Sequence, residues 1–396
     1  MIYLDNNATT KVDEKVLESM MPYFTEEYAN PSSIYDFSKK SSRAIKEARG
    51  VIKDFINAND EKEIIFTSCG SESANTAIKG VLNYNKAKKH IVTTKVEHPC
   101  VLNVYKSLEK QGYKVDYLSV NSNGDLDLEE LDSVINPETA LVSIMWANNE
   151  TGVINPIKKV SEIIKSKNPD TKLFVDAVQV AGKIPMDVQE MGIDLLGISG
   201  HKFHAPKGVG ALYLSNKVKI DPIIFGGNQE RGKRGGTSNT AGIVGFAKAS
   251  EIAHRDMKTN NHKVRALSEY FVTKLAERVE NANFNANTRQ KLPHIISVSF
   301  VGVDGESLLT KLDINGLAVS TGSACSTNSL TVSHVMTAIG LNNEDARGTI
   351  RFSLGKNNSY EELDKAINII ARSVEELRAY SSTYGMKTRK RKGDSK

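Results

Sequence analysis

The sequence predicts an α/β fold in which helices cover both faces of a mainly parallel sheet. Short apolar runs alternate with amphipathic stretches over the first two-thirds of the chain, and this alternation is typical of parallel strands joined by helices. One such stretch, residues 44–56, spaces its apolar side chains as one buried face of a helix requires. The expected strands are 63–67, 90–94, 114–119, 140–145, 172–176, 194–198 and 210–214.

Length and pattern together predict two domains and a tail. The chain has 396 residues, which is enough for one large domain and an appended smaller one. From about residue 239 to residue 280 the pattern is strongly helical, as expected for a long connector. Later segments fit a smaller α/β domain, with strands at 295–300 and 349–354 and helices near 306–312 and from 360 to about 380. We predict a large domain at 15–255, a small domain formed by 1–14 and 256–385, and a basic flexible tail at 386–396.

Composition and charge are typical of a soluble globular protein. Hydrophobic residues make up 39% of the chain and charged residues 25%. The net charge of +5 comes from the tail, and a solvated terminus is its simplest interpretation. Contact of the tail with nucleic acid, a membrane or an acidic partner is the alternative. No apolar run approaches the length of a membrane span, and the polar N-terminus does not have the pattern of a signal peptide, so we expect a cytoplasmic protein.

The three cysteines, Cys69, Cys100 and Cys325, lie far apart in the sequence. No pair forms Cys-x-x-Cys, which argues against a disulfide framework and against a metal site built by this chain alone. Cys325 lies in the stretch 320–329, where no residue is larger than asparagine or threonine. Such a segment buries little surface, so we expect it to be mobile.

Small and polar residues follow four of the expected strands at their carboxyl ends. After the strand at 63–67 the chain reads Ser-Cys-Gly-Ser-Glu-Ser, so the next helix begins with free N–H groups and hydroxyls that suit an anion. A helix capped by serine would give the same pattern. The other three strand ends carry a carboxylate, an amine and amides, at Asp176, Gln179, Ser199, His201, Lys202, Asn148 and Asn149.

These groups are the ones that pyridoxal phosphate (PLP) requires, provided that the four strand ends meet at one sheet edge. Ligands of such folds bind beyond the carboxyl ends of the strands. The phosphate requires the anion cradle, the aldehyde an amine, the ring nitrogen a carboxylate and the phenolic oxygen a donor. A lone lysine is usually a surface charge, but Lys202 follows an apolar strand beside small residues, which favours a desolvated amine.

The chain as a whole resembles the cysteine desulfurases of the NifS/IscS type, which are class V aminotransferase-like, fold-type I PLP enzymes. The resemblance extends from Tyr3 to Gly355 and looks closest to the NifS branch in segments 145–152 and 201–206. Its motifs are Tyr3-Leu-Asp-Asn-Asn-Ala-Thr-Thr10, Asn30-Pro-Ser-Ser33, Glu97-His98-Pro99, Asn148-Asn-Glu150, Asp176-Ala-Val-Gln179, Ser199-Gly-His-Lys202, Pro206-Lys-Gly208, Gln229-Glu-Arg-Gly232, Gly322-Ser-Ala-Cys325 and Arg351-Phe-Ser-Leu-Gly355. It implies a large domain with a mainly parallel seven-stranded sheet and a smaller α/β domain.

The resemblance also implies a role for each candidate residue. Lys202 would form the Schiff base with PLP, Asp176 would pair with the ring nitrogen, and His98 would stack on the ring and move protons. Further PLP contacts are implied for residues at the phenolic oxygen and the phosphate, namely Asn149, Gln179, Gly70, Ser71, Ser199 and His201. Ser71 stands where the family usually has threonine, and it keeps the hydroxyl.

Two further residues complete the implied site. Arg351 would bind the substrate carboxylate through its planar guanidinium, beside Asn149. Thr237 would reach the phosphate held by a partner subunit, so the resemblance implies a homodimer.

For Cys325 the resemblance implies the role of sulfur carrier. L-Cysteine would form an external aldimine with PLP, and the Cys325 thiolate would then attack the substrate sulfur. The products would be L-alanine and a Cys325 persulfide, which passes sulfur to an acceptor such as an iron–sulfur scaffold protein. A loop of small residues suits a thiol that must serve both a pocket and an acceptor. An inert cysteine in a linker is the simpler interpretation of this stretch alone, and we interpret Cys69 and Cys100 as small buried residues.

Three alternatives remain open from the sequence. The first is another fold-type I PLP enzyme, such as an aminotransferase or a selenocysteine lyase. The second is a non-catalytic platform for scaffold proteins, although the set Lys202, Asp176, His98 and Cys325 argues against it. The third gives the basic tail a role with nucleic acid, which we do not expect, and no membrane partner is expected either.

Overall fold

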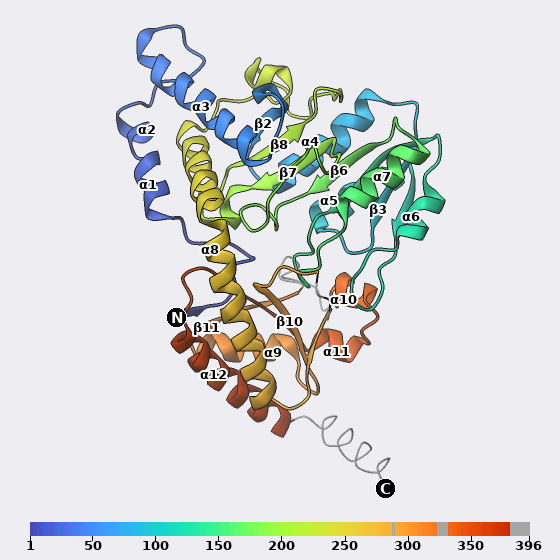
Figure 1. Ribbon diagram of the computed structural model, residues 1–396, viewed down its shortest axis with the longest axis vertical. Helices are drawn as coiled ribbons and strands as arrows, with labels where there is room; N and C mark the ends of the chain where they lie inside the picture. Colours follow the sequence, from blue (N-terminus) through green and yellow to red (C-terminus); the bar gives the residue numbers. More distant parts are fainter. Residues whose placement is uncertain (287, 289, 323–331, 381–396) are drawn as a thin grey trace.

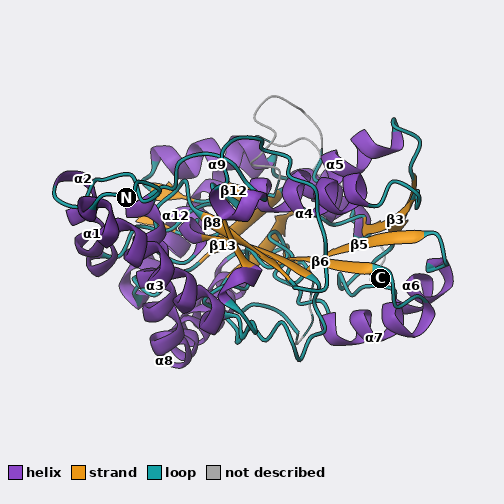
Figure 2. Cartoon of the chain, turned by 90° about the horizontal axis from the view of Figure 1, so that it is seen from above, coloured by secondary structure: helices purple, strands orange, loops and turns teal. Residues whose placement is uncertain are grey.

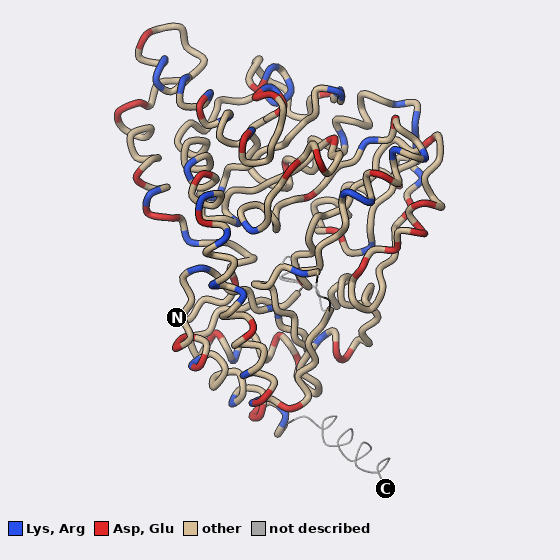
Figure 3. Tube along the Cα trace, viewed as in Figure 1, with Lys and Arg blue, Asp and Glu red and all other residues tan. Residues whose placement is uncertain are grey.

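The computed structural model describes residues 1–286, 288, 290–322 and 332–380, which form two packed units joined by one long helix (Figure 1). The basic tail expected at 386–396 and the cysteine at 325 lie outside the described residues. In the described part, charges of both signs are interspersed along the chain (Figure 3). No helix of that part is long and apolar enough to cross a membrane.

The larger unit is built on a seven-stranded sheet in the order β2-β8-β7-β6-β5-β3-β4. Its strands are β2 (Ile64–Thr67), β3 (His90–Thr94), β4 (Lys114–Leu118), β5 (Thr139–Met145), β6 (Lys172–Asp176), β7 (Leu195–Ser199) and β8 (Gly210–Leu214). All neighbours are parallel except those of β8, which runs antiparallel to both β2 and β7. The mainly parallel seven-stranded sheet is therefore confirmed, and each strand ends within one residue of its predicted limits.

Helices cover both faces of this sheet, as Figure 2 shows. Side chains alternate along each strand, so β2 places Ile64 and Phe66 in one core and Ile65 in the other. The first core lies under α3 (Lys39–Phe55), α6 (Leu128–Val134), α7 (Ile157–Lys167) and the start of α8 (Thr240–Arg278). The second lies under α4 (Gly70–Tyr84) and α5 (Pro99–Glu109). Two further helices, α1 (Glu14–Met20) and α2 (Pro22–Thr25), lie near α8 at the N-terminal edge.

The smaller unit contains an antiparallel sheet and a third core. The sheet order is β12-β13-β10-β9, and β1 pairs in parallel with β11 beside it. These strands are β1 (Ile2–Tyr3), β9 (Ala282–Phe284), β10 (Ile295–Phe300), β11 (Leu317–Ala318), β12 (Ser320–Thr321) and β13 (Thr349–Ser353). The helices are α9 (Gly305–Ile314), α10 (His334–Ala338), α11 (Asn343–Arg347) and α12 (Tyr360–Ala379). The strands of two or three residues were not predicted, because they are too short to show a strand pattern.

The connector predicted at 239–280 is α8, a helix of 39 residues. It begins at Asn239, whose side chain accepts a hydrogen bond from the Gly242 N–H at 3.0 Å. Up to Ile252 its buried side chains belong to the large core, and from Val264 onward they belong to the small core. The domain limits expected at residue 255 stay a prediction, which this change of core supports.

Candidate active site

Ten of the predicted site residues line one cavity of about 350 Å³ between the two units. They come from the carboxyl ends of β5, β6 and β7, from the N-termini of α4 and α5, and from β13 of the small unit. Parallel strands and helix N-termini meet at the same sheet edge, which explains why distant motifs converge there. These residues are Gly70, Ser71, His98, Asn149, Asp176, Gln179, Ser199, His201, Lys202 and Arg351.

One end of the cavity is built for an anion. The helix α4 begins at Gly70 without a side-chain cap, so its first N–H groups and its positive dipole end face the cavity. A Cβ on Gly70 would lie 2.7 Å from a methyl group of Val178, so only glycine lets the backbone approach here. The buried Ser199 hydroxyl has no hydrogen-bond partner among the described residues. Its unmet donor points to a ligand oxygen.

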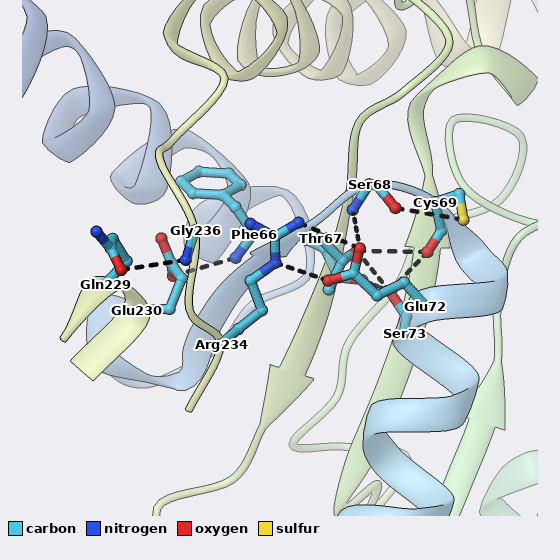
Figure 4. Close-up of polar contacts among 11 residues, drawn as sticks. Phe66, Thr67, Ser68, Cys69, Glu72, Ser73, Gln229, Glu230, Arg234 and Gly236 are labelled. Carbon is cyan, nitrogen blue, oxygen red and sulfur yellow. Dashed lines mark hydrogen bonds and ion pairs between the residues drawn. The ribbon is translucent and has the colours of Figure 1, made fainter. Parts of the chain in front are cut away.

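A buried ion pair braces this helix start from the outside (Figure 4). The Glu72 carboxylate accepts a hydrogen bond from the Ser68 N–H at 2.8 Å and one from Arg234 Nε at 2.8 Å. Both side chains are largely buried, and the pair holds the pKa of Glu72 below its usual value even though burial opposes this. The pair therefore ties the segment that carries Arg234 to the anion end of the cavity.

Asp176 is the last residue of β6 and is only 8% exposed. Burial raises the pKa of its carboxyl to about 6, while the Val178 N–H and the charge of Lys202 oppose that rise. The Val178 N–H donates to Asp176 Oδ1 at 2.9 Å, which fixes the carboxylate. A cationic ring nitrogen placed against this buried group would stabilise its ionised form.

Lys202 follows β7 in a short 3-10 turn, and its amine reaches back to the N-terminal segment. Its Nζ donates to the carbonyl oxygen of Ala8 at 2.9 Å and to that of Asn7. Asn7 was not predicted as a site residue, although it belongs to the first quoted motif. His201, which precedes Lys202 and also lines the cavity, has a pKa lowered to about 4, mainly by burial and then by the charge of Lys202.

His98 caps the start of α5 and stays neutral. Its Nδ1 accepts a hydrogen bond from the Cys100 N–H at 3.2 Å, so the neutral ring carries its proton on Nε2. Burial, followed by the charges of Lys202, His334 and Arg351, lowers the pKa of His98 to about 4. The ring can therefore accept or return a proton without first losing a charge.

Arg351 reaches the cavity from β13, and an acidic partner from the N-terminal segment already binds it. One Nη donates to the Asp5 carboxylate at 2.9 Å and the other to the Asn149 carbonyl oxygen at 3.0 Å. Its buried Nε has no partner among the described residues. Burial raises the pKa of Asp5 even though the charge of Arg351 and the hydrogen bond from it oppose that rise. Asp5 was missed because one acidic residue near a terminus carries no pattern of its own.

Two buried glutamates beside the cavity were also missed. Glu97 precedes His98, and burial raises the pKa of its carboxyl to about 8. Glu150 accepts a hydrogen bond from the Ser333 hydroxyl at 2.6 Å, and burial raises its pKa to about 7. A Cβ on Gly322 would lie 2.2 Å from the same carboxylate, so Glu150 contacts both Gly322 and Ser333. Both glutamates belong to motifs quoted above, Glu-His-Pro and Asn-Asn-Glu, and these motifs were the signal in the sequence that could have identified them.

Two predicted site residues are not placed in the cavity. Thr237 is exposed and does not line it, and the partner subunit that it was predicted to serve is not part of the structure. Cys325 lies outside the described residues, and Gly322, which lines the cavity, is the last described residue before it. Cys69 and Cys100 are half-buried and line the cavity, rather than being simply buried as expected. Burial raises the pKa of the Cys100 thiol, which keeps it protonated.

The fold and the cavity define an α/β protein whose site combines an anion cradle, a buried carboxylate, a lysine and a neutral histidine. Residues 2–366 match the family model described as aminotransferase class-V. The chain therefore belongs to the aminotransferase class-V family.

Curated relatives and solved structures agree with this assignment. A "Cysteine desulfurase" from a Nostoc species is 46% identical over 381 residues, which cover 96% of this chain and 94% of that protein. A "Cysteine desulfurase IscS" from Clostridium botulinum is 46% identical over 383 residues, 96% of each protein. A structure titled "NIFS-LIKE PROTEIN" has a TM-score of 0.89 at 40% identity and covers 94% of this chain and 99% of that one. Another, titled "SspA in complex with cysteine", has a TM-score of 0.81 at 36% identity and covers 91% and 100%.

Proposed function

We propose that this chain is a PLP-dependent cysteine desulfurase, which converts L-cysteine to L-alanine and keeps the sulfur as a persulfide. The observation that carries the proposal is the convergence of Lys202, Asp176, His98 and Arg351 on one cavity. Relatives named cysteine desulfurase match over nearly the whole chain, which favours this reaction over others of the family. In the overall reaction a protein thiol and L-cysteine give a protein persulfide and L-alanine, so atoms and electrons balance without an added oxidant.

The residues of the cavity fit PLP. The unpartnered Ser199 hydroxyl and the N–H groups around Gly70 suit the phosphate, and the Gln179 amide, whose Oε1 has no partner among the described residues, could donate through its Nε2 to the phenolic oxygen. Asp176 would hold the ring nitrogen and Lys202 would hold the aldehyde carbon. When bound there, PLP supplies an electron sink for charge that develops at the substrate Cα.

Side chains of the protein bind the substrate and transfer its protons. Arg351 binds the substrate carboxylate, which displaces Asp5 from the guanidinium, and the Asn149 carbonyl keeps the arginine in place. Neutral His98 and the Lys202 amine are the groups that can take the Cα proton and return one to the product carbon. The position of the cavity between the two units limits the access of water to these transfers.

Cys325 receives the sulfur in this proposal. Gly322 lines the cavity, and Cys325 follows it by three residues, which span at most ~11 Å when extended, and this short separation in the sequence supports the assignment. The thiolate attacks the substrate sulfur, the Cβ–S bond breaks, and the carbon takes a proton to become the methyl group of alanine. The persulfide then delivers sulfur to an acceptor protein, for which an iron–sulfur scaffold is the proposed class.

A homodimer in the cytoplasm completes the proposal. Thr237 is exposed and lies three residues after Arg234, which Glu72 holds, so Thr237 is accessible to a second subunit. The test of the function is product analysis with purified holoenzyme and L-cysteine, in the presence of a thiol reductant. We expect alanine and sulfide in equal amounts and neither product from Lys202→Ala. Formation of a keto acid in place of alanine would instead identify an aminotransferase.

A further inference from the structure

A second cavity, of about 170 Å³, shares the lining residue Lys202 with the first one. It lies along α8 between residues 249 and 265, where that helix passes from the large core to the small core. Its other walls come from both units, including the segments 182–184, 291–294 and 354–356. An occupant of this cavity would therefore contact both units at their junction.

Positive charge dominates the lining of this second cavity. Among the described residues, its walls contain no aspartate or glutamate. They contain several basic side chains, which are Lys183, Lys202, Arg265, Lys291 and Lys356. Partly buried ammonium groups are costly without a counter-charge, so the important question is which of them have an acidic partner.

Two of the lysines have no acidic partner in the described part of the chain. Lys183 Nζ donates only to carbonyl oxygens, at 3.1 Å to Gln179 and at 3.3 Å to Lys202. For Lys291, no hydrogen bond or ion pair to another described residue engages the ammonium, although the side chain is half-buried. By contrast, Lys356 pairs with Asp13 at 2.8 Å.

The electrostatics of both lysines agree with a missing counter-ion. Burial alone lowers the pKa of Lys291 to about 8. Burial, followed by the charge of Lys202, lowers the pKa of Lys183 to about 7. A bound anion would favour the charged form of both amines.

We propose that this cavity is a binding site for a small dicarboxylate, whose two charges are balanced by Lys183 and Lys291. The walls of the cavity also include Phe203, Ile252 and Leu292, which suit the carbon chain of an organic anion better than an inorganic one. Cysteine and alanine are excluded as occupants because their ammonium group would face a cationic wall. Dicarboxylate binding does not require the proposed desulfurase reaction, although Lys202 lines both cavities.

Occupancy of this site is coupled to the first cavity through the backbone. Lys183 holds the carbonyl oxygens of Gln179 and Lys202, and both of these residues line the first cavity. An anion that recruits the Lys183 ammonium competes with these two hydrogen bonds. We therefore expect binding to change the environment of Lys202 as well as the charge of the second cavity.

Titration calorimetry of the holoenzyme with succinate tests the proposal. We expect one binding site per chain, with an affinity at least tenfold weaker in Lys291→Met and largely retained in Lys291→Arg. The control Lys258→Met removes an exposed lysine of α8 outside the cavity and should leave the affinity unchanged. Arg351→Gln, which disables the carboxylate site of the first cavity, should also leave it unchanged.

Several results would overturn the proposal. They are no succinate binding to the wild type, equal binding by Lys291→Met, or loss of binding in Arg351→Gln alone. Tighter binding of inorganic phosphate than of succinate would contradict the assignment to dicarboxylates. Unfolding temperatures of all variants are measured beside the titrations, and the retained affinity of Lys291→Arg shows that charge rather than folding sets the result.

Discussion

Replacement of the buried Glu97 by glutamine should stabilise the protein in a pH-dependent way. Burial raises the pKa of this carboxyl from 4.5 to about 8, so at pH 7 the folded protein holds a proton that the unfolded chain releases. A carboxyl with a raised pKa costs stability as the pH rises from its unfolded pKa to its folded pKa, and it costs little below that window. Glutamine is neutral throughout and keeps the oxygen that accepts from Thr94 and Met145.

The size of the effect follows from the two pKa values. Each pH unit inside the window is worth about 1.4 kcal/mol, so ionisation of the unfolded chain costs about 3 kcal/mol at pH 7 and about 1 kcal/mol at pH 5. The stability of Glu97→Gln relative to the wild type should therefore rise by roughly 2 kcal/mol between pH 5 and pH 7. Any constant cost of the amide cancels in this difference.

Urea unfolding of the holoenzyme at several pH values measures this difference. The matched control is Glu269→Gln, which changes an exposed glutamate of α8 and should follow the wild type at each pH. A relative stability of Glu97→Gln that is the same at pH 5 and pH 7 would refute the reasoning, because it would mean that Glu97 ionises in the folded protein as it does in the unfolded chain.

Three further predictions concern the cavity. Gly70→Ala places a Cβ against Val178 and should weaken PLP binding at least tenfold in a spectrophotometric titration. Unchanged binding would mean that the backbone at Gly70 does not hold the phosphate. Arg351→Lys loses the planar fork and should raise the KM for L-cysteine by roughly tenfold to a hundredfold, and an unchanged KM would assign the substrate carboxylate elsewhere. Glu150→Ala removes the acceptor of the Ser333 hydroxyl and should lower the unfolding free energy by about 1–3 kcal/mol in urea, and an unchanged value would show that this bond is not stabilising.

Much of the fold was predictable because its signals are local. The strands of the large sheet are apolar runs bounded by polar residues, and α8 is a long uninterrupted helical pattern, so the pattern of apolar and polar residues was enough to predict their limits. The two-residue strands β1 and β11 are different, because only their pairing across the whole chain makes them strands. No local pattern encodes such a pairing.

The residues of the site also fall into those that the sequence pattern predicts and those that it does not. Lys202 and Asp176 were found because Asp176 ends one buried strand and Lys202 follows another, and the sheet then brings those strand ends together. Asp5, Glu97 and Glu150 act through burial and through contacts with distant residues, which sequence spacing does not express. Their motifs were visible, but the strengths of their interactions depend on a three-dimensional environment.

In the proposed reaction, L-cysteine bound in the cavity that Lys202 lines gives its sulfur to Cys325. Mass spectrometry of the peptide that contains Cys325, after the holoenzyme reacts with L-cysteine, tests this claim most directly. We expect one added sulfur atom on Cys325 in the wild type and none in Lys202→Ala, with Cys69 and Cys100 unmodified in both. An added sulfur on Cys69 or Cys100 in place of Cys325, or an equal yield in Lys202→Ala, would contradict it.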